Sequence, residues 1–175
     1  VGGWASNSLG HSHPVLVKAL ADQASKLWLA SNQFYTVPQT QLAEALVELS
    51  GLDRVFLANS GAEANDGAIK LARKWGKVHR DGAYEIISAI DSFHGRTLAT
   101  TAATGQSHYR EAFTPIPEGF SYVEFDNVEA LMAATTDRTV GVLLEPVQGE
   151  GGVNLPSDDY LKRVRSWCDE KDLLL

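Results

Sequence analysis

Three short segments of this sequence combine residue types that suit the binding of a small, charged and partly aromatic molecule. Segment 59–65 supplies small residues beside a serine, segment 91–97 an aromatic ring and an arginine, and segment 145–152 two carboxylates among glycines. Each segment directly follows a short apolar run that is typical of a buried strand, and these runs lie at 54–58, 85–90 and 140–144. Loops positioned by such strands often carry binding residues.

The first segment places Ser60 at the beginning of a helical pattern. Glu63 follows three residues later, which is the spacing of a capping box, so a purely structural helix cap is one interpretation. The other interpretation is a phosphate site. Gly61 and Ala62 are small enough for an anion to approach the backbone N–H groups at the positive end of the helix. The two interpretations are compatible, since Ser60 can cap the helix and also contact a phosphate.

In the second segment, Phe93 precedes Arg96 by three residues. A flat ring beside a site can stack on a planar cofactor. The fork of an arginine can grip a substrate carboxylate through two parallel hydrogen bonds. The structural alternative is that Phe93 lies in the core and Arg96 pairs with an acidic neighbour. His94 is a candidate general base, although a lone histidine more often orients a loop.

The third segment begins with Glu145 at the end of a predicted strand, and Glu150 follows five positions later. Two carboxylates of this kind could form an acid/base pair, as in glycosidases. The neighbouring Gly149, Gly151 and Gly152 instead favour a backbone packed close to something bulky, such as a bound cofactor. A plain surface turn is the third alternative.

A phosphate anchor, a stacking ring, an arginine for carboxylates and acidic partners together indicate a phosphorylated planar heterocycle that handles amino acids. Pyridoxal phosphate fits, because its ring is an electron sink for carbanions next to an amine. Helical patterns between the apolar runs predict an α/β fold with a mostly parallel sheet flanked by helices. Ligands of such sheets bind in the crevice beyond the carboxyl ends of the strands, so we expect all three loops to face one crevice.

The predicted elements follow from hydrophobic periodicity and from proline, glycine and serine at their ends. Helices are expected at 14–29, 38–49, 61–78, 128–134 and 158–171. Strands are expected at 54–58, 85–90, 122–125 and 140–144, and residues 91–120 are expected to be irregular. The last residues, from Asp172 to Leu175, read as the beginning of another buried strand.

The composition narrows the function classes. The 175 residues carry a formal charge of −7, which argues against broad nucleic-acid or anionic-membrane binding and favours a soluble, cytoplasmic protein. No apolar stretch approaches the roughly 18 residues of a membrane span. The single cysteine, Cys168, is expected to be a half-buried core thiol. His11 and His13 have no third ligand nearby, so no metal site is predicted.

Both ends of the sequence read as the middle of a longer chain. There is no initiator methionine, and residues from Val1 to Trp4 look like the interior of a segment. We therefore expect a fragment of a larger enzyme. Residues 1–10 would be the tail end of an N-terminal segment, and residues 11–175 a cofactor-binding large domain that is incomplete at its C-terminal side.

Segments 7–14, 59–65, 92–97 and 145–152 resemble the class III pyridoxal-phosphate aminotransferases, which have fold-type I. The resemblance covers essentially the whole chain and is strongest to the members that act on acetylornithine. It implies the large domain of that fold and a homodimer with its site at the subunit interface. Cofactor binding would fall to Ser60, Gly61, Ala62 and Phe93, and substrate binding to Arg96, Glu145 and Glu150.

The resemblance also implies what this chain does not carry. The lysine that bonds the cofactor would lie beyond residue 175, as would the aspartate that pairs with the pyridine nitrogen. A mobile arginine that pairs with Glu150 would also lie outside the chain. We therefore expect no catalytic residue among these 175 and no complete reaction cycle from them alone.

The expected activity is the transfer of an amino group from acetylornithine to 2-oxoglutarate, serving arginine synthesis. Within the family, the alternatives are a 4-aminobutyrate, ornithine or succinylornithine aminotransferase. Outside the family, they are a hydrolase that uses Glu145 and Glu150 as a carboxylate pair, and a binding module for a phosphorylated ligand.

Overall fold

The computed structural model describes residues 2–3 and 6–175, which form two compact units. The first unit runs to Val55 and the second comprises Phe56–Leu175, and each is described by itself. The interpretation of the N-terminus rests partly on Val1 and Trp4, which lie outside the described residues.

The first unit contains two helices, α1 (Pro14–Ala24) and α2 (Val37–Ser50). Helix α2 ends at Gly51, whose φ of 69° is the left-handed conformation expected of a glycine cap. Helix α1 ends at Ala24, five residues before its predicted end at Leu29. The apolar residues beyond it, such as Trp28 and Leu29, are exposed, so no packing within the unit supports a longer helix.

The second unit is built on a parallel sheet of three strands in the order β2-β1-β3. The strands are β1 (Glu85–Ala89), β2 (Phe120–Val123) and β3 (Thr139–Leu143). Beside β3, Leu174 forms an isolated parallel bridge with Gly141. The backbone N–H of Leu174 donates to the carbonyl of Val140 at 3.1 Å, and its carbonyl accepts from Val142 at 2.8 Å. Leu174 therefore pairs with β3 in the segment where a buried strand was predicted, through this single bridge.

The predicted strand at 54–58 is wrong. These residues form no strand in the described chain, and the Phe56 side chain is 74% exposed. Its ring lies against Gly67 of helix α3 (Gly61–His79). A Cβ placed on Gly67 would be 2.9 Å from the Phe56 Cε1 atom. Phe56 thus packs on a helix, and no described strand pairs with the backbone of this run.

The helices of the second unit are α3 (Gly61–His79), α4 (Leu98–Ala103), α5 (Ser107–Glu111), α6 (Val128–Ala134) and α7 (Tyr160–Glu170). Helices α4 and α5 lie in the stretch that was expected to be irregular. Both are too short to show a helical period in the sequence. A reciprocal capping box between Thr97 and Thr100 begins α4. Strand β2 begins at Phe120, two residues before its predicted start.

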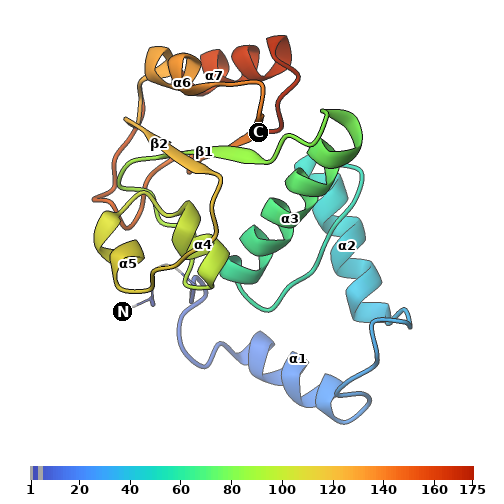
Figure 1. Cartoon of the computed structure of the whole chain (residues 1–175). Coiled ribbons are helices and arrows are strands. Elements are labelled where there is room, and N and C mark those ends of the chain that lie inside the picture. Colours follow the sequence, from blue (N-terminus) through green and yellow to red (C-terminus); the bar gives the residue numbers. More distant parts are fainter. Residues whose placement is uncertain (1, 4–5) are drawn as a thin grey trace. The chain divides into compact units, whose positions relative to one another are not determined.

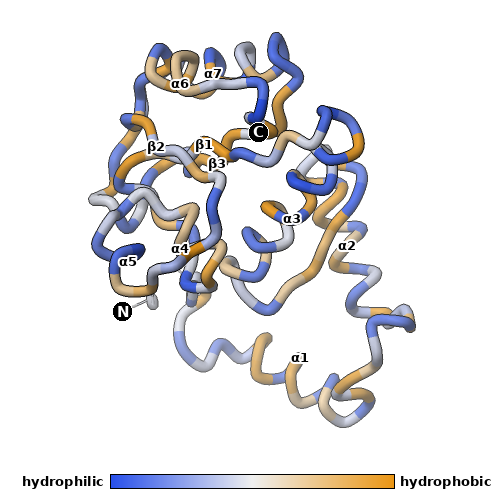
Figure 2. Tube along the Cα trace, viewed as in Figure 1, coloured by the Kyte–Doolittle hydropathy of each residue, from blue (hydrophilic) through white to orange (hydrophobic). Residues whose placement is uncertain are grey.

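Helices cover both faces of this sheet (Figure 1). On one face, α6 and α7 pack on Ile87 of β1 and Val142 of β3. On the other face, α3 and α4 pack on Ile86 and Val140. Strands β1 and β3 are correspondingly hydrophobic in Figure 2. Cys168 of α7 is fully buried in the first of these clusters, deeper than expected, and burial raises the pKa of its thiol.

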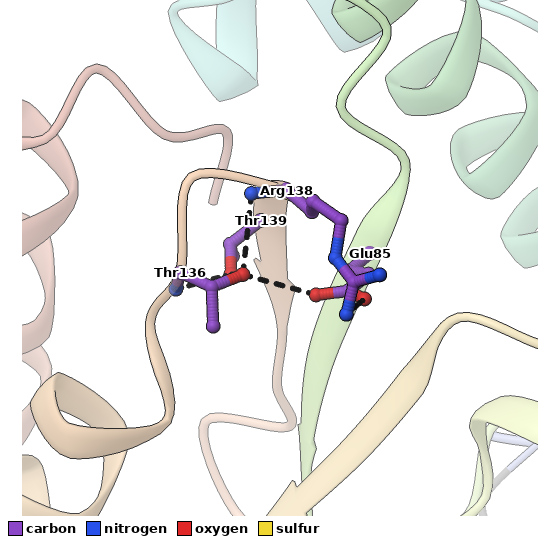
Figure 3. Close-up of polar contacts among 4 residues, drawn as sticks. All are labelled: Glu85, Thr136, Arg138 and Thr139. Atoms are coloured by element: carbon purple, nitrogen blue, oxygen red, sulfur yellow. Dashed lines mark hydrogen bonds and ion pairs between the residues drawn. The ribbon is translucent and has the colours of Figure 1, made fainter.

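The amino ends of β1 and β3 are fastened by polar contacts (Figure 3). Arg138 forms an ion pair with Glu85 at 2.7 Å, and the Thr136 hydroxyl donates to the other Glu85 oxygen at 3.0 Å. The β1–β3 register shifts at this point, because Glu85 pairs with Thr139 whereas Ile86 pairs with Gly141. The extra residue on β3 is Val140, as in a β-bulge.

No helix within the described residues is long and apolar enough to cross a membrane.

Candidate active site

The loops that follow β1 and β3 are joined by hydrogen bonds and by close backbone contact. The backbone N–H of Phe93 donates to the Glu145 carboxylate at 3.1 Å. The side-chain amide of Gln148 donates to the carbonyl of Ile90 at 2.7 Å. A Cβ on Gly151 would lie 2.4 Å from the carbonyl oxygen of Asp91. The neighbouring loop therefore requires a glycine at position 151. The sequence suggested another reason for this glycine, namely close contact with a cofactor.

The same β1 loop also contacts the beginning of α3. Gly95 has a φ of 129°, and a Cβ there would lie 2.7 Å from the Cβ of Ala62. The side-chain amide of Asn65 donates to the carbonyl of His94 at 2.8 Å. Ala62, Phe93 and Glu145, predicted from three separate segments, thus belong to segments in direct contact.

Ser60 caps α3, as predicted, and its hydroxyl oxygen accepts from the backbone N–H of Glu63 at 3.2 Å. The second half of the predicted capping box is absent from the described contacts. The Glu63 carboxylate accepts instead from the backbone and side chain of Asn59, at 2.8 and 2.9 Å. Gly61 and Ala62 hold the first two N–H groups of the helix, which have no partner within it and lie at its positive end. This end of α3 can therefore bind an anion.

Phe93 and Arg96 lie against a third aromatic residue, Tyr109 of α5. The Phe93 and Tyr109 rings meet edge to face, with centroids 5.9 Å apart. The Arg96 Cζ atom is 5.8 Å from the Phe93 ring centroid and 5.1 Å from that of Tyr109. Phe93 is half-buried and outside both core clusters. Arg96 is exposed, and it forms no ion pair with any carboxylate in the described part of the chain.

His94 is buried, with 4% of its surface exposed, between Phe93 and Gly95. Its Nε2 atom is 3.0 Å from the Ser88 hydroxyl on β1, and its backbone N–H donates to the Thr104 hydroxyl at 3.0 Å. Burial lowers the pKa of the imidazole to about 4, so the ring is neutral at neutral pH. These contacts tie the loop to β1 and to the end of α4.

The two carboxylates of the third segment differ in their contacts. Both oxygens of Glu145 accept backbone hydrogen bonds, from Phe93 at 3.1 Å and from Gly149 at 3.3 Å. Glu150 is half-buried and has an interaction partner of its own. Glu145 therefore links the loop after β1 to the loop after β3. A carboxylate in an acid/base pair would not need these backbone hydrogen bonds.

The sequence did not predict three residues that contact the site loops, namely Tyr109, Ser88 and Thr104. Tyr109 lies 13 residues after Arg96, in a helix of five residues with no motif to mark it. Ser88 is a polar residue within a strand, which could have indicated a buried hydrogen-bond partner.

The whole chain is similar to known proteins of one family. The family Aminotransferase class-III matches residues 1–175. The acetylornithine aminotransferase of Methanocaldococcus jannaschii is 54% identical over 170 residues, which are 97% of this chain and 43% of the relative. The chain thus spans less than half the length of the curated relatives it matches.

Two solved structures are similar as well. The N-acetylornithine aminotransferase of Stenotrophomonas maltophilia K279a has a TM-score of 0.76 and 43% identity, over 95% of this chain and 41% of that one. An ornithine aminotransferase from Toxoplasma gondii, with partial occupancy of PLP at its active site, has a TM-score of 0.89 and 34% identity, over 99% and 42%. The predicted fold, a mostly parallel sheet flanked by helices as in fold-type I aminotransferases, is confirmed. The chain belongs to the class III aminotransferases.

Proposed function

We propose that this chain is part of a pyridoxal-phosphate enzyme that transfers an amino group from acetylornithine to 2-oxoglutarate, in arginine synthesis. The observation that carries the proposal is the contact between the beginning of α3 and the loop of Phe93 and Arg96. It brings the N-terminus of α3 close to an aromatic ring and to an arginine without an acidic partner among the described residues. The identity of 54% to an acetylornithine aminotransferase supports this substrate.

The residues present fit the cofactor. The N–H groups of Gly61 and Ala62, with the Ser60 hydroxyl, would hold its phosphate. A Cβ placed on Gly61 would meet no atom within 4 Å, so an anion can reach the backbone there. Phe93 would stack on the ring from the adjacent loop. When bound, the cofactor supplies an electron sink for the carbanion that forms beside the substrate nitrogen.

The remaining site residues would act on the substrate. Arg96 would grip a carboxylate of acetylornithine or glutamate through its guanidinium fork. Glu145 and Glu150 would line the substrate side of the pocket. Two backbone hydrogen bonds hold the Glu145 carboxylate, so its orientation is set before any substrate arrives. Glu150 would pair with a mobile arginine beyond residue 175.

Four parts of the proposal concern the whole protein. Residues 11–175 would belong to the cofactor-binding large domain, with residues 1–10 ending an N-terminal segment. The lysine that bonds the cofactor would lie beyond residue 175. The enzyme would be a cytoplasmic homodimer, and the 175-residue chain alone would not sustain turnover.

The test is a substrate comparison with the full-length enzyme. We expect bound cofactor to give a visible absorbance band. We also expect kcat/KM to be higher for acetylornithine than for succinylornithine, ornithine or 4-aminobutyrate, with 2-oxoglutarate as the acceptor. A higher value for one of those donors would replace the proposed substrate. A purified full-length protein that neither binds the cofactor nor transfers an amino group would overturn the proposal entirely.

A further inference from the structure

Tyr109 is the one aromatic residue in the described chain whose ring contacts both Phe93 and Arg96. No sequence motif marks this residue, and it has no role in the proposed function. We propose that Tyr109 is a positioning residue. Its ring would contact the flat face of the Arg96 guanidinium, so that the N–H edge of the guanidinium is directed to a substrate carboxylate. The inference rests on the proposed carboxylate role of Arg96 and deepens it.

The geometry of an arginine explains why a stacking partner suits this task. A guanidinium is planar, and its N–H donors lie in the plane, at the edge of the fork. An ion pair with a protein carboxylate would occupy that edge. Stacking on a ring instead uses the face of the plane and leaves the edge available for two parallel hydrogen bonds. The Arg96 Cζ atom lies over the Tyr109 and Phe93 rings, 5.1 and 5.8 Å from their centroids, and these ring contacts involve no carboxylate.

Helix α5 is anchored, so that Tyr109 has a defined position. The next residue, Arg110, donates from Nη1 to the carbonyl of Thr104 at 2.6 Å. Its Cζ atom also lies 3.9 Å from the ring centroid of Tyr122 on β2. On the other side, the His108 ring is 4.1 Å from the Tyr109 ring. The tyrosine is therefore supported from the sheet and can restrict the side-chain conformations of Arg96.

A restrained arginine should bind a carboxylate more tightly than a free one, because less side-chain freedom is lost on binding. Removing the Tyr109 ring should thus weaken carboxylate binding and leave the chemical step and the cofactor contacts unchanged. A residue needed only for folding would instead change stability, cofactor affinity and turnover together.

The experiment uses the full-length enzyme with its cofactor bound. For Tyr109→Ala we expect KM for 2-oxoglutarate to rise about threefold to tenfold. The Kd of glutarate, a dicarboxylate without a keto group, should rise equally when measured by calorimetry. The kcat and the cofactor affinity should stay within about twofold of wild type. Tyr109→Phe keeps the ring and should behave as wild type.

Tyr84→Ala is a matched control, because Tyr84 also lies beneath an arginine, with the Arg73 Cζ atom 5.9 Å from its ring centroid. Tyr84 directly precedes β1, at the end of the sheet remote from the candidate site. This variant should leave the glutarate Kd unchanged. An equal loss of glutarate affinity in Tyr84→Ala and Tyr109→Ala would overturn the inference.

Arg96→Ala, measured in parallel, separates the inference from the proposed function. If Arg96→Ala leaves the glutarate Kd unchanged, the carboxylate role of Arg96 fails and the inference fails with it. If Arg96→Ala weakens glutarate but Tyr109→Ala does not, only the inference fails. The double variant should bind glutarate no more weakly than Arg96→Ala alone, since Tyr109 would act only through the arginine. A further additive loss would also overturn the inference.

Discussion

The backbone N–H of Phe93 and the side chain of Glu145 are joined by a hydrogen bond of 3.1 Å across 52 residues of sequence. One of the two residues is the proposed stacking ring and the other is a proposed substrate contact. Their bond makes the position of the ring depend on the loop after β3. Changes at Glu145 should therefore be detectable in the cofactor as well as in the substrate.

Glu145→Ala should weaken cofactor binding by about tenfold, because the backbone N–H groups of Phe93 and Gly149 lose a charged acceptor. The measurement is the cofactor Kd of the full-length enzyme by absorbance titration. Glu129→Ala is a matched control, since Glu129 pairs with Arg163 between α6 and α7 on the exposed surface. An unchanged cofactor Kd with a raised substrate KM would limit Glu145 to a substrate role.

Phe93→Ala should loosen the cofactor by about twofold to tenfold and shift its visible spectrum, because a stacked ring contributes about 0.5–1.5 kcal/mol beyond area burial. Cofactor affinity and absorbance maxima of the full-length enzyme measure this. Phe113→Ala removes an exposed phenylalanine that forms no ring contact among the described residues, and should change neither. Identical spectra for wild type and Phe93→Ala would mean that the ring only packs.

Arg96→Ala should raise KM for the carboxylate substrates by about tenfold or more, the usual effect of losing a hydrogen bond to a charged group. The cofactor should remain bound, because Arg96 has no predicted contact with it. Steady-state kinetics and an absorbance spectrum of the same preparation check both statements. Arg165→Ala, which breaks an ion pair with Asp169 on α7, should leave the kinetics unchanged. Normal KM values in Arg96→Ala would refute the carboxylate grip.

His94 should make the folded protein less stable in acid. Burial lowers the pKa of its imidazole to about 4, against about 6.5 in an unfolded chain. The unfolded state therefore binds more protons between these values, so stability is full above pH 6.5 and falls as the pH drops towards 4. The loss attributable to His94 should reach at most about 3 kcal/mol. Urea unfolding of wild type and His94→Gln at a series of pH values would measure it, and parallel curves for the two proteins would contradict it.

Glu85→Gln should affect stability and nothing in the site. The variant removes the charge of an ion pair whose Arg138 partner is largely exposed, which is worth at most about 1 kcal/mol. The free energy of unfolding and the cofactor Kd together check this. A weakened cofactor would show that the amino ends of β1 and β3 influence their carboxyl ends.

The sequence predicted best where an element has a clear period or a buried apolar run. Strands β1 and β3 and helices α3 and α6 lie where they were expected. Residues 54–58 show the limit of this reasoning, because an apolar run of five residues becomes a strand only if a neighbouring strand pairs with it. Here Phe56 packs on α3 instead.

The candidate site was predictable in its loops but not in its contacts. The rule that parallel strands end at one edge brought Phe93 and Glu145 together in advance. The partners of those residues depend on tertiary packing, which local sequence does not encode. Tyr109 of α5 lies beside Arg96, and the neighbouring Arg110 contacts Tyr122 of β2, so both contacts depend on residues far apart in the sequence. The backbone role of Glu145 likewise follows from the distance between two loops.

The order β2-β1-β3 has a consequence for where a ligand can enter. After β1 the chain continues into α4 on one face of the sheet, and after β3 it continues towards α7 on the opposite face (Figure 1). Adjacent strands whose connections diverge in this way form a topological switch point, where open α/β sheets bind their ligands. The strand connections alone thus favour a ligand site at the carboxyl ends of β1 and β3, and side chains then add specificity.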